Sequence, residues 1–216
     1  MRLVFALLAL AATAWPQAAG EVNTRYRSKE GRAQVAAGLA NPNRDKTQKP
    51  EAVVAALGLR PGMTVADIGT GIGYMLPYLS KAVGPSGKVL AEDVQSDFLD
   101  QARAKVDVAK LLNVSLILGG FTDPKLPPGA VDVELLLDVY HHFDQPQKML
   151  AALAPALKPG GRLVIVEYHK ADSPQPGHIL REWSDVVREV ESSGYHLQSK
   201  VDRITVNQYL LTFVRK

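Results

Sequence analysis

Three glycines at alternate positions constrain the fold of this chain more than any other feature of its 216 residues. Gly69, Gly71 and Gly73 follow a short β-rich run at residues 64–68 and precede an apolar run typical of a helix. Because glycine adopts positive φ angles and has no side chain, it lets a ligand lie directly on the main chain. The pattern predicts a strand, a tight turn and a helix start, with a ligand on the turn.

The spacing and the charges of this loop argue against a dinucleotide ligand. Dinucleotide loops read G-x-G-x-x-G, but Tyr74 stands where the last glycine would fall. Residues 63–78 also contain no Lys or Arg to meet a phosphate. About twenty residues after Gly73, a second β-like run ends in Glu92 and Asp93, where a carboxylate is placed to accept both hydroxyls of a ribose. The pattern favours a ligand with a ribose and a cationic part.

From about residue 43 to its end, the chain resembles the class I S-adenosylmethionine-dependent methyltransferases. The matching runs are residues 65–73, 89–93, 131–133, 138–143 and 157–163. The resemblance implies S-adenosyl-L-methionine as cofactor and transfer of its methyl group to an oxygen, nitrogen or carbon of a small molecule. The cofactor contacts that it implies are Asp67, Gly69, Gly71 and Gly73 on the methionine part, Asp93 on the ribose, and Gly120, Phe121 and Asp138.

One departure from the family pattern concerns the adenine ring. Many members carry an acid near the position of Gly120 that accepts from the adenine amino group, whereas the nearest acid here is Asp123. Phe121 is placed to stack on or cover the ring, although an aromatic residue of the core fits the same pattern. The adenine contacts of this chain therefore differ from those of many relatives.

Strand-like and helix-like runs alternate regularly after residue 43, which is typical of a parallel sheet covered on both faces. We expect helices at residues 50–57, 74–82, 97–110 (capped by Ser96), 147–157 and 179–193, and strands at residues 64–68, 88–92, 115–118, 131–137, 162–168, 196–204 and 209–214. The short connection at residues 205–207 makes the last two strands an antiparallel hairpin. The predicted class is α/β: a doubly wound, mostly parallel, Rossmann-like sheet of seven strands.

Candidate catalytic groups follow the fourth and fifth predicted strands. His141 and His142 come after the fourth strand, in the loop that faces the methyl group in the resembled fold, and Glu167 ends the fifth. If the acceptor is a hydroxyl or an amine, a base must take its proton, and histidine is matched to neutral pH for that task. His141 is the first candidate base, His142 the second and Glu167 the third; packing or helix capping is the alternative role for either histidine.

A metal centre at the same place is an alternative that the residue types allow. Asp138, His142, Glu167 and His169 offer ligand atoms. However, Mg²⁺ prefers an octahedron of oxygen atoms, and two adjacent histidines lack the spacing of a zinc-binding helix. We therefore expect no metal.

The N-terminal residues have the pattern of a targeting segment. Residues 3–15 are apolar, which suits the core of a signal peptide and falls short of the about twenty residues of a membrane span. Small residues at positions 18–20 offer a cleavage site, so we expect residues 1–20 to be an export signal. The alternative is a retained anchor with the domain in the cytoplasm, because four basic residues follow: Arg25, Arg27, Lys29 and Arg32. Residues 21–43 then form a polar linker or a lid, and residues 44–216 the methyltransferase domain.

The composition excludes some classes of binding partner and of chemistry. The net charge of +3 is spread without a long basic block, so nucleic acid is not expected, and contact with a membrane is expected only through the N-terminal segment. The chain has no cysteine, which excludes thiol-relayed chemistry. A non-catalytic S-adenosylmethionine- or S-adenosylhomocysteine-binding protein, acting as an exported sensor, stays open as the alternative function.

Overall fold

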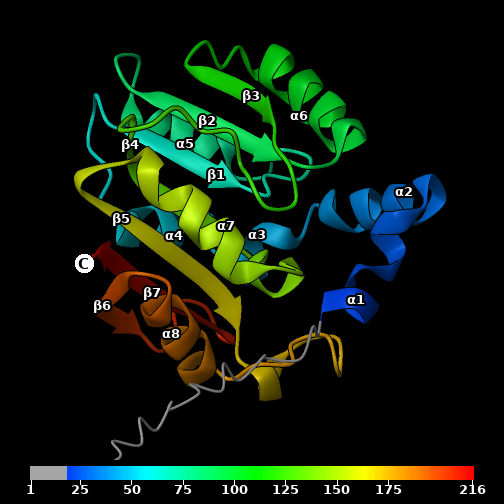
Figure 1. The fold of residues 1–216 in the computed structure, drawn as a ribbon. Coiled ribbons are helices and arrows are strands. Elements are labelled where there is room, and N and C mark those ends of the chain that lie inside the picture. The colour runs from blue at the N-terminus through cyan, green and yellow to red at the C-terminus, as the bar shows by residue number, and fades with distance from the viewer. Residues whose placement is uncertain (1–18) are drawn as a thin grey trace, which may run out of the picture.

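A computed structural model describes residues 19–216 as one seven-stranded sheet with helices on both faces (Figure 1). Its strand order is β3-β2-β1-β4-β5-β7-β6. The strands are β1 (Thr64–Ile68), β2 (Lys88–Asp93), β3 (Val114–Leu118), β4 (Val131–Leu137), β5 (Leu157–Tyr168), β6 (Tyr195–Val201) and β7 (Gln208–Arg215). The first five pair in parallel, whereas β7 runs antiparallel to both β5 and β6. The predicted fold class, including the antiparallel hairpin, is confirmed.

Two apolar cores hold the helices against the sheet. On one face lie α4 (Pro50–Leu57), α5 (Leu76–Val83) and α6 (Ser96–Ala109), whose buried side chains meet those of the sheet. On the other face lie α7 (Pro146–Leu153) and α8 (Trp183–Ser192). β4 serves both cores because its side chains alternate: Val133, Leu135 and Leu137 face the first core and Leu136 the second.

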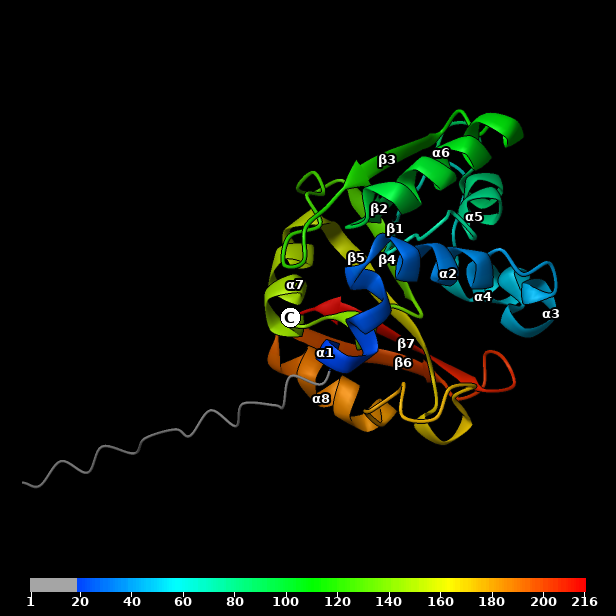
Figure 2. The same ribbon diagram turned by 90° about the vertical axis from the view of Figure 1, so that its right-hand side faces the viewer.

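The N-terminal helices lie across the carboxyl ends of the parallel strands (Figure 2). They are α1 (Ala19–Val22), the 3₁₀ turn η1 (Asn23–Arg27), α2 (Lys29–Leu39) and α3 (Arg44–Gln48). An ion pair of 2.7 Å between Arg32 and Asp97 ties α2 to α6, and the Tyr26 ring packs edge-on against Phe98. Residues 21–43, which the sequence left open between a linker and a lid, are therefore packed onto the domain.

Several element ends differ from the sequence prediction for local reasons. The helix expected to reach residue 157 ends at Leu153, because Pro155 lies in the 3₁₀ turn η3 (Ala154–Ala156) and has no N–H for a helix interior. The helix expected from residue 179 begins at Trp183, where Glu182 and Asp185 form a capping box. Ser96, expected as a cap, is the first residue of α6 instead.

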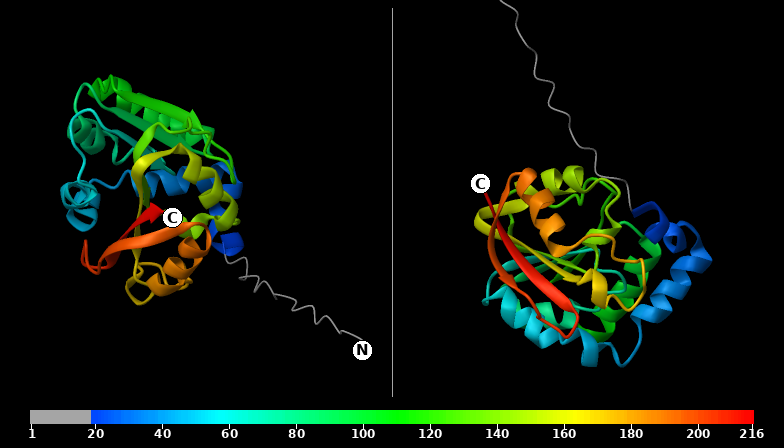
Figure 3. Two further views of the ribbon diagram at one scale, coloured as in Figure 1. Left: turned by 60° about the vertical axis from the view of Figure 1, so that its left-hand side comes forward. Right: turned by 90° about the horizontal axis from the view of Figure 1, so that it is seen from below.

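The segment from β5 to α8 borders the same end of the sheet. It contains the 3₁₀ turn η4 (Lys170–Asp172), while a further turn, η2 (Tyr140–His142), follows β4. The views in Figure 3 place these connections and the N-terminal helices at one end of the sheet. Within residues 19–216, no helix is both long and apolar enough to span a membrane, and the predicted leader lies almost wholly outside the described residues.

Candidate active site

A cavity of about 1120 Å³ opens at the carboxyl ends of β1, β2, β4 and β5. The loop after β1 and the end of β2 line one side, η2 and residues 173–178 line the other, and the N-terminal helices border the opening. In open α/β sheets, ligands bind at this edge, where the strand order reverses beside β1. Its volume suits a nucleoside-sized ligand together with a second small molecule.

The glycine loop presents bare main chain to this cavity. Gly69, Gly71 and Gly73 all have positive φ angles, of +67°, +56° and +76°. A Cβ on Gly69 would lie 2.3 Å from Val139, so this position excludes any side chain. Gly69 and Gly71 line the cavity. Gly73 instead packs against α6, where a Cβ would meet Ala102 at 3.2 Å.

Asp67 and Thr70 form a polar pair at the end of β1. Asp67 is buried, and its Oδ2 accepts a 2.7 Å hydrogen bond from the Thr70 hydroxyl. Burial raises the pKa of Asp67 to about 6, although the hydrogen bond opposes the shift. Both residues line the cavity, which gives the cationic part of a ligand a carboxylate to approach.

Asp93 ties the end of β2 to the glycine loop. Its Oδ2 accepts from the Gly71 N–H and its Oδ1 from the Gln95 N–H, both at 2.8 Å. Burial raises the pKa of Asp93 to about 6, against the effect of these hydrogen bonds. Each carboxylate oxygen has two lone pairs, so each keeps one for a ligand hydroxyl. Asp93 therefore fits the ribose role that the resemblance implies.

Glu92, the acid next to Asp93, is almost fully buried. Among the described residues, its Oε1 has no hydrogen-bond partner, while its Oε2 accepts from the Gly69 N–H at 3.3 Å. Burial and the Asp93 charge raise the pKa of Glu92 to about 8. A Cβ on Gly119 would lie 1.8 Å from Oε1, so the glycine at this end of β3 makes room for Glu92.

The two predicted adenine contacts are separated by the structure. Phe121 is 65% exposed and lies on the cavity lining, where its ring is free to cover a flat ligand. Gly120 forms an isolated bridge with Asp123 and lies outside the lining. Asp123 accepts the Gly120 N–H through its main-chain oxygen, at 2.7 Å. The loop thus contributes Phe121 to the cavity, and Gly120 holds the turn behind it.

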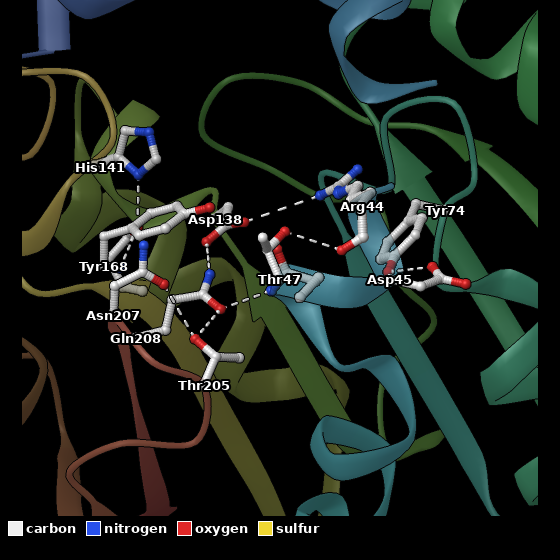
Figure 4. Close-up of polar contacts among 12 residues, drawn as sticks. Arg44, Asp45, Thr47, Tyr74, Asp138, His141, Tyr168, Thr205, Asn207 and Gln208 are labelled. Atoms are coloured by element: carbon white, nitrogen blue, oxygen red, sulfur yellow. Dashed lines mark hydrogen bonds and ion pairs between the residues drawn. The ribbon is translucent and has the colours of Figure 1, made fainter. Parts of the chain in front are cut away.

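Asp138 lies at the centre of a polar chain between the two sides of the site (Figure 4). Its backbone is left-handed, with φ of +54°, and its Oδ1 accepts from Gln208 at 2.5 Å. Arg44 of α3 lies 3.9 Å from Oδ2, and Gln208 accepts a 2.8 Å hydrogen bond from the buried Gln48. Burial, followed by the charge of Glu167, raises the pKa of Asp138 to about 7.

His141 is oriented by Glu167. The His141 Nδ1 lies 2.5 Å from a Glu167 carboxylate oxygen, so Nδ1 is the protonated nitrogen and Nε2 faces away, 3.0 Å from His178 Nε2. Burial lowers the pKa of His141, but the charge and hydrogen bond of Glu167 outweigh burial and raise it. Glu167 itself is buried behind the histidine, and it lines only the small pocket beside the main cavity.

His142 is held by the N-terminal segment. Its Nδ1 lies 2.8 Å from the Asn23 side-chain oxygen, and its Nε2 lies 3.4 Å from the Tyr26 hydroxyl. Burial and the nearby imidazoles of His141 and His178 place the pKa of His142 well below its usual value. One ring nitrogen each of His141, His142 and His178 lies within 4.8 Å of the other two.

The ligand set considered from the sequence is not assembled in this form. His169 is half-buried, and its Nε2 lies 2.7 Å from the Asp202 carbonyl oxygen rather than beside His142. His178, from the loop before α8, lies beside His141 and His142 instead. Asp45, which is exposed beside Arg44, accepts hydrogen bonds from the Tyr74 and Tyr78 hydroxyls.

Sequence reasoning missed four residues that border the cavity or hold its walls: Asn23, Tyr26, Arg44 and Gln208. Three of them precede the first recognisable motif, and Gln208 begins the last strand, so no motif marks them. Their positions become visible only when α3 and β7 meet at Asp138.

Comparison with known proteins decides the family. A crystal structure of a SAM-dependent methyltransferase from Aquifex aeolicus superimposes with a TM-score of 0.78 at 33% identity, covering 83% of this chain and 96% of that chain. The chain belongs to the S-adenosylmethionine-dependent methyltransferases. The family described as a methyltransferase domain matches residues 65–161. The cofactor of this family member is S-adenosyl-L-methionine, and the bare glycine loop and Asp93 fit it.

Curated relatives are longer than this methyltransferase-family chain. The ubiquinone/menaquinone biosynthesis C-methyltransferase UbiE of Vibrio campbellii is 28% identical over 151 residues, which cover 69% of this chain and 54% of that protein. An uncharacterized 37.1 kDa protein in transposon TN4556 of Streptomyces fradiae is 38% identical over 112 residues, or 32% of its length. The chain spans about half or less of these relatives.

Proposed function

We propose that this chain transfers the methyl group of S-adenosyl-L-methionine to an oxygen, nitrogen or carbon of a small molecule. One observation carries the proposal: a single cavity joins the glycine loop and Asp93 to His141 and His178 on the opposite wall. A cofactor held by the first pair would point into space bordered by the second. The similarity to UbiE, a C-methyltransferase, supports the same type of reaction.

The cofactor side of the cavity has the groups that each part of the cofactor needs. Gly69 and Gly71 leave room for the methionine part to lie on the main chain, with Asp67 close to its positive charges. Asp93 accepts the ribose hydroxyls, and Phe121 covers the adenine ring. The half-buried Asp138 and Arg44 line the cavity between the cofactor and acceptor sides.

The acceptor side supplies positioning and a proton acceptor. When bound, the cofactor supplies an electrophilic methyl group, which leaves sulfur as the acceptor atom bonds to its carbon, and S-adenosylhomocysteine remains. The protein must hold the acceptor in line for this displacement. If the acceptor atom carries a proton, His141 takes it on Nε2 while Glu167 stabilises the charged ring. Proton transfer to His142 is less suited, since its pKa lies well below the usual value.

The walls of the cavity favour a small acceptor. Residues 173–178 and the helices of residues 19–43 narrow the opening over the acceptor side. We also propose that nucleic acid is not the substrate, because the positive charge is not gathered in a basic block. We further propose that residues 1–20 direct export or act as an anchor with the domain in the cytoplasm.

The test is a two-step measurement on the full chain. Calorimetric titration with S-adenosylmethionine measures cofactor binding, and a screen of phenols, amines and activated carbon acids measures S-adenosylhomocysteine release. We expect micromolar binding and release with at least one acceptor class. His141→Ala should keep cofactor affinity and lower turnover by about 100-fold for a protic acceptor, whereas His196→Ala, an exposed histidine on β6, should change neither. Cofactor binding without release from any class would favour the binding-protein alternative, and no binding would refute the proposal.

A further inference from the structure

We propose that His141, His142 and His178 bind one divalent transition-metal ion, with Zn²⁺ as the best fit, through their Nε2 atoms on the acceptor side of the cavity. Metal binding itself does not depend on the methyl-transfer proposal. Imidazole nitrogen suits zinc, and three histidines with one open position are an established ligand pattern of catalytic zinc sites.

Two of the three nitrogen atoms already lie at nearly the spacing of a tetrahedral site. One ring nitrogen from each histidine lies within 4.8 Å of the others, and the Nε2 atoms of His141 and His178 are 3.0 Å apart. In a tetrahedral site with Zn–N bonds of about 2.05 Å, two ligand nitrogens lie about 3.3 Å apart. The His141–His178 pair therefore needs to open by only a few tenths of an ångström.

Glu167 prepares His141 as an Nε2 ligand. A carboxylate accepts hydrogen bonds, so the proton on His141 resides on Nδ1, which lies 2.5 Å from the Glu167 oxygen. This leaves the Nε2 lone pair toward the cavity. A carboxylate behind a metal-bound imidazole is the usual way in which proteins fix the tautomer and strengthen the ligand.

Asn23 prepares His142 in the same way. The Asn23 amide nitrogen donates to the main-chain oxygen of His142 at 2.9 Å, which fixes the orientation of the amide. Its side-chain oxygen therefore faces His142 Nδ1, at 2.8 Å, and accepts the Nδ1 proton. The Nε2 of His142 then carries the lone pair that a metal needs, and among the described residues the Tyr26 hydroxyl lies 3.4 Å from it.

His178 completes the trio from another part of the chain. In the metal-free protein its Nε2–H donates to His141 Nε2, because the Nε2 of His141 carries no proton. A metal ion replaces that proton, and His178 shifts to the Nδ1–H tautomer. The negative charge of Glu167, which is buried behind His141, partly offsets the charge of the ion.

The open position of the ion would face the cavity, because all three histidines line it. This consequence does rest on the proposed function: an acceptor hydroxyl bound there would lose its proton more readily, as water does on zinc. With metal in place, His141 acts as a ligand and takes no proton; the ion instead lowers the pKa of the bound hydroxyl, whose proton passes to solvent water at the open side of the cavity. The acceptor class would then be an oxygen nucleophile, such as a phenol or an enol.

The test uses the full chain without a histidine tag, stripped with a chelator and titrated with Co²⁺ and Zn²⁺. We expect one equivalent of either ion to bind, with submicromolar affinity for Zn²⁺, and visible absorption bands of four-coordinate Co²⁺. His178→Ala should weaken binding by about 100-fold, and Asn23→Ala, which removes a positioning residue, by about 10-fold. His169→Ala should leave affinity unchanged, since His169 lies outside the trio.

These measurements test metal binding separately from methyl transfer. Cofactor affinity and thermal midpoint, measured on every variant, show whether it is folded. Wild-type protein that binds cofactor but no metal overturns the metal site and leaves the proposed function in place. Binding that a folded His178→Ala variant retains in full also overturns it. Metal binding in a chain that never releases S-adenosylhomocysteine would support the site and refute the proposed function.

Discussion

Replacing Asp93 by Asn should weaken cofactor binding, and the hydrogen bonds of Asp93 allow the loss of binding free energy to be estimated. Both carboxylate oxygens already accept one backbone N–H each, from Gly71 and Gln95, and each keeps one lone pair for a ribose hydroxyl. An amide keeps only one acceptor atom, and its NH₂ group must face one of the two N–H donors. Asp93→Asn therefore loses a charge-assisted bond to the ribose and leaves a loop N–H without a partner.

The expected loss is about 2–3 kcal/mol, or roughly 30- to 150-fold in Kd, since bonds to charged groups contribute about 1.5–3 kcal/mol each. Calorimetry with S-adenosylmethionine at pH 7 measures it. The matched control is Glu92→Gln on the same strand. Because the pKa of Glu92 is raised to about 8, its side chain is mostly neutral at pH 7, and an amide should change Kd less than about threefold.

The pH dependence gives a second arm of the same experiment. Burial raises the pKa of Asp93 to about 6, so lowering the pH through 6 protonates the free protein and should weaken cofactor binding. Asp93→Asn has no such proton to gain and should lose this part of the dependence. A Kd for Asp93→Asn within about threefold of wild type would refute the ribose assignment. An equal loss in Glu92→Gln would mean that the loop, and not the ribose contact, had been disturbed.

Three further outcomes follow from the packing. Gly73→Ala should lower the free energy of unfolding by about 1–3 kcal/mol in chemical denaturation, because its φ is +76° and a Cβ would lie 2.8 Å from a leucine methyl. Gly129→Ala, with a positive φ but open space around it, should lower the free energy of unfolding by less. Equal losses in the two variants would contradict the packing argument. Glu134→Gln should raise the thermal midpoint more at pH 8 than at pH 5. Burial raises the pKa of Glu134 well above its usual value, and neither carboxylate oxygen has a partner among the described residues. The wild-type protein therefore loses stability as the pH rises above the pKa of Glu134 in the unfolded state. A difference in thermal midpoint that does not grow with pH would contradict this assignment. Arg32→Ala should speed cofactor release about threefold or more in stopped-flow measurements, since it removes the ion pair with Asp97 that ties α2 to α6. An unchanged release rate would show that α2 does not cover the cofactor.

Sequence alone determined the fold class and the two segments that meet at one edge of the sheet, the glycine loop and the end of β2, because both depend on short-range patterns. It did not determine each contact, since Gly73 and Gly120 lie outside the cavity lining. Gly69, Gly71 and Gly73 allow only a tight turn, Asp93 lies at the end of the next strand, and the alternation of strands and helices leaves one fold class. Parallel strands bring these segments to one edge without further information. The prediction of the antiparallel hairpin rested on the same local reasoning.

Only the tertiary structure decided the acceptor side. His141, His142 and His178 come from two segments joined by β5, and the residues that orient the first two, Glu167 and Asn23, lie 26 and 119 positions away from them. No periodicity marks such pairs, because their proximity results from how η1, η2 and the loop before α8 pack at the end of the sheet. The tautomers of the histidines, and hence the chemistry open to them, depend on these long-range contacts.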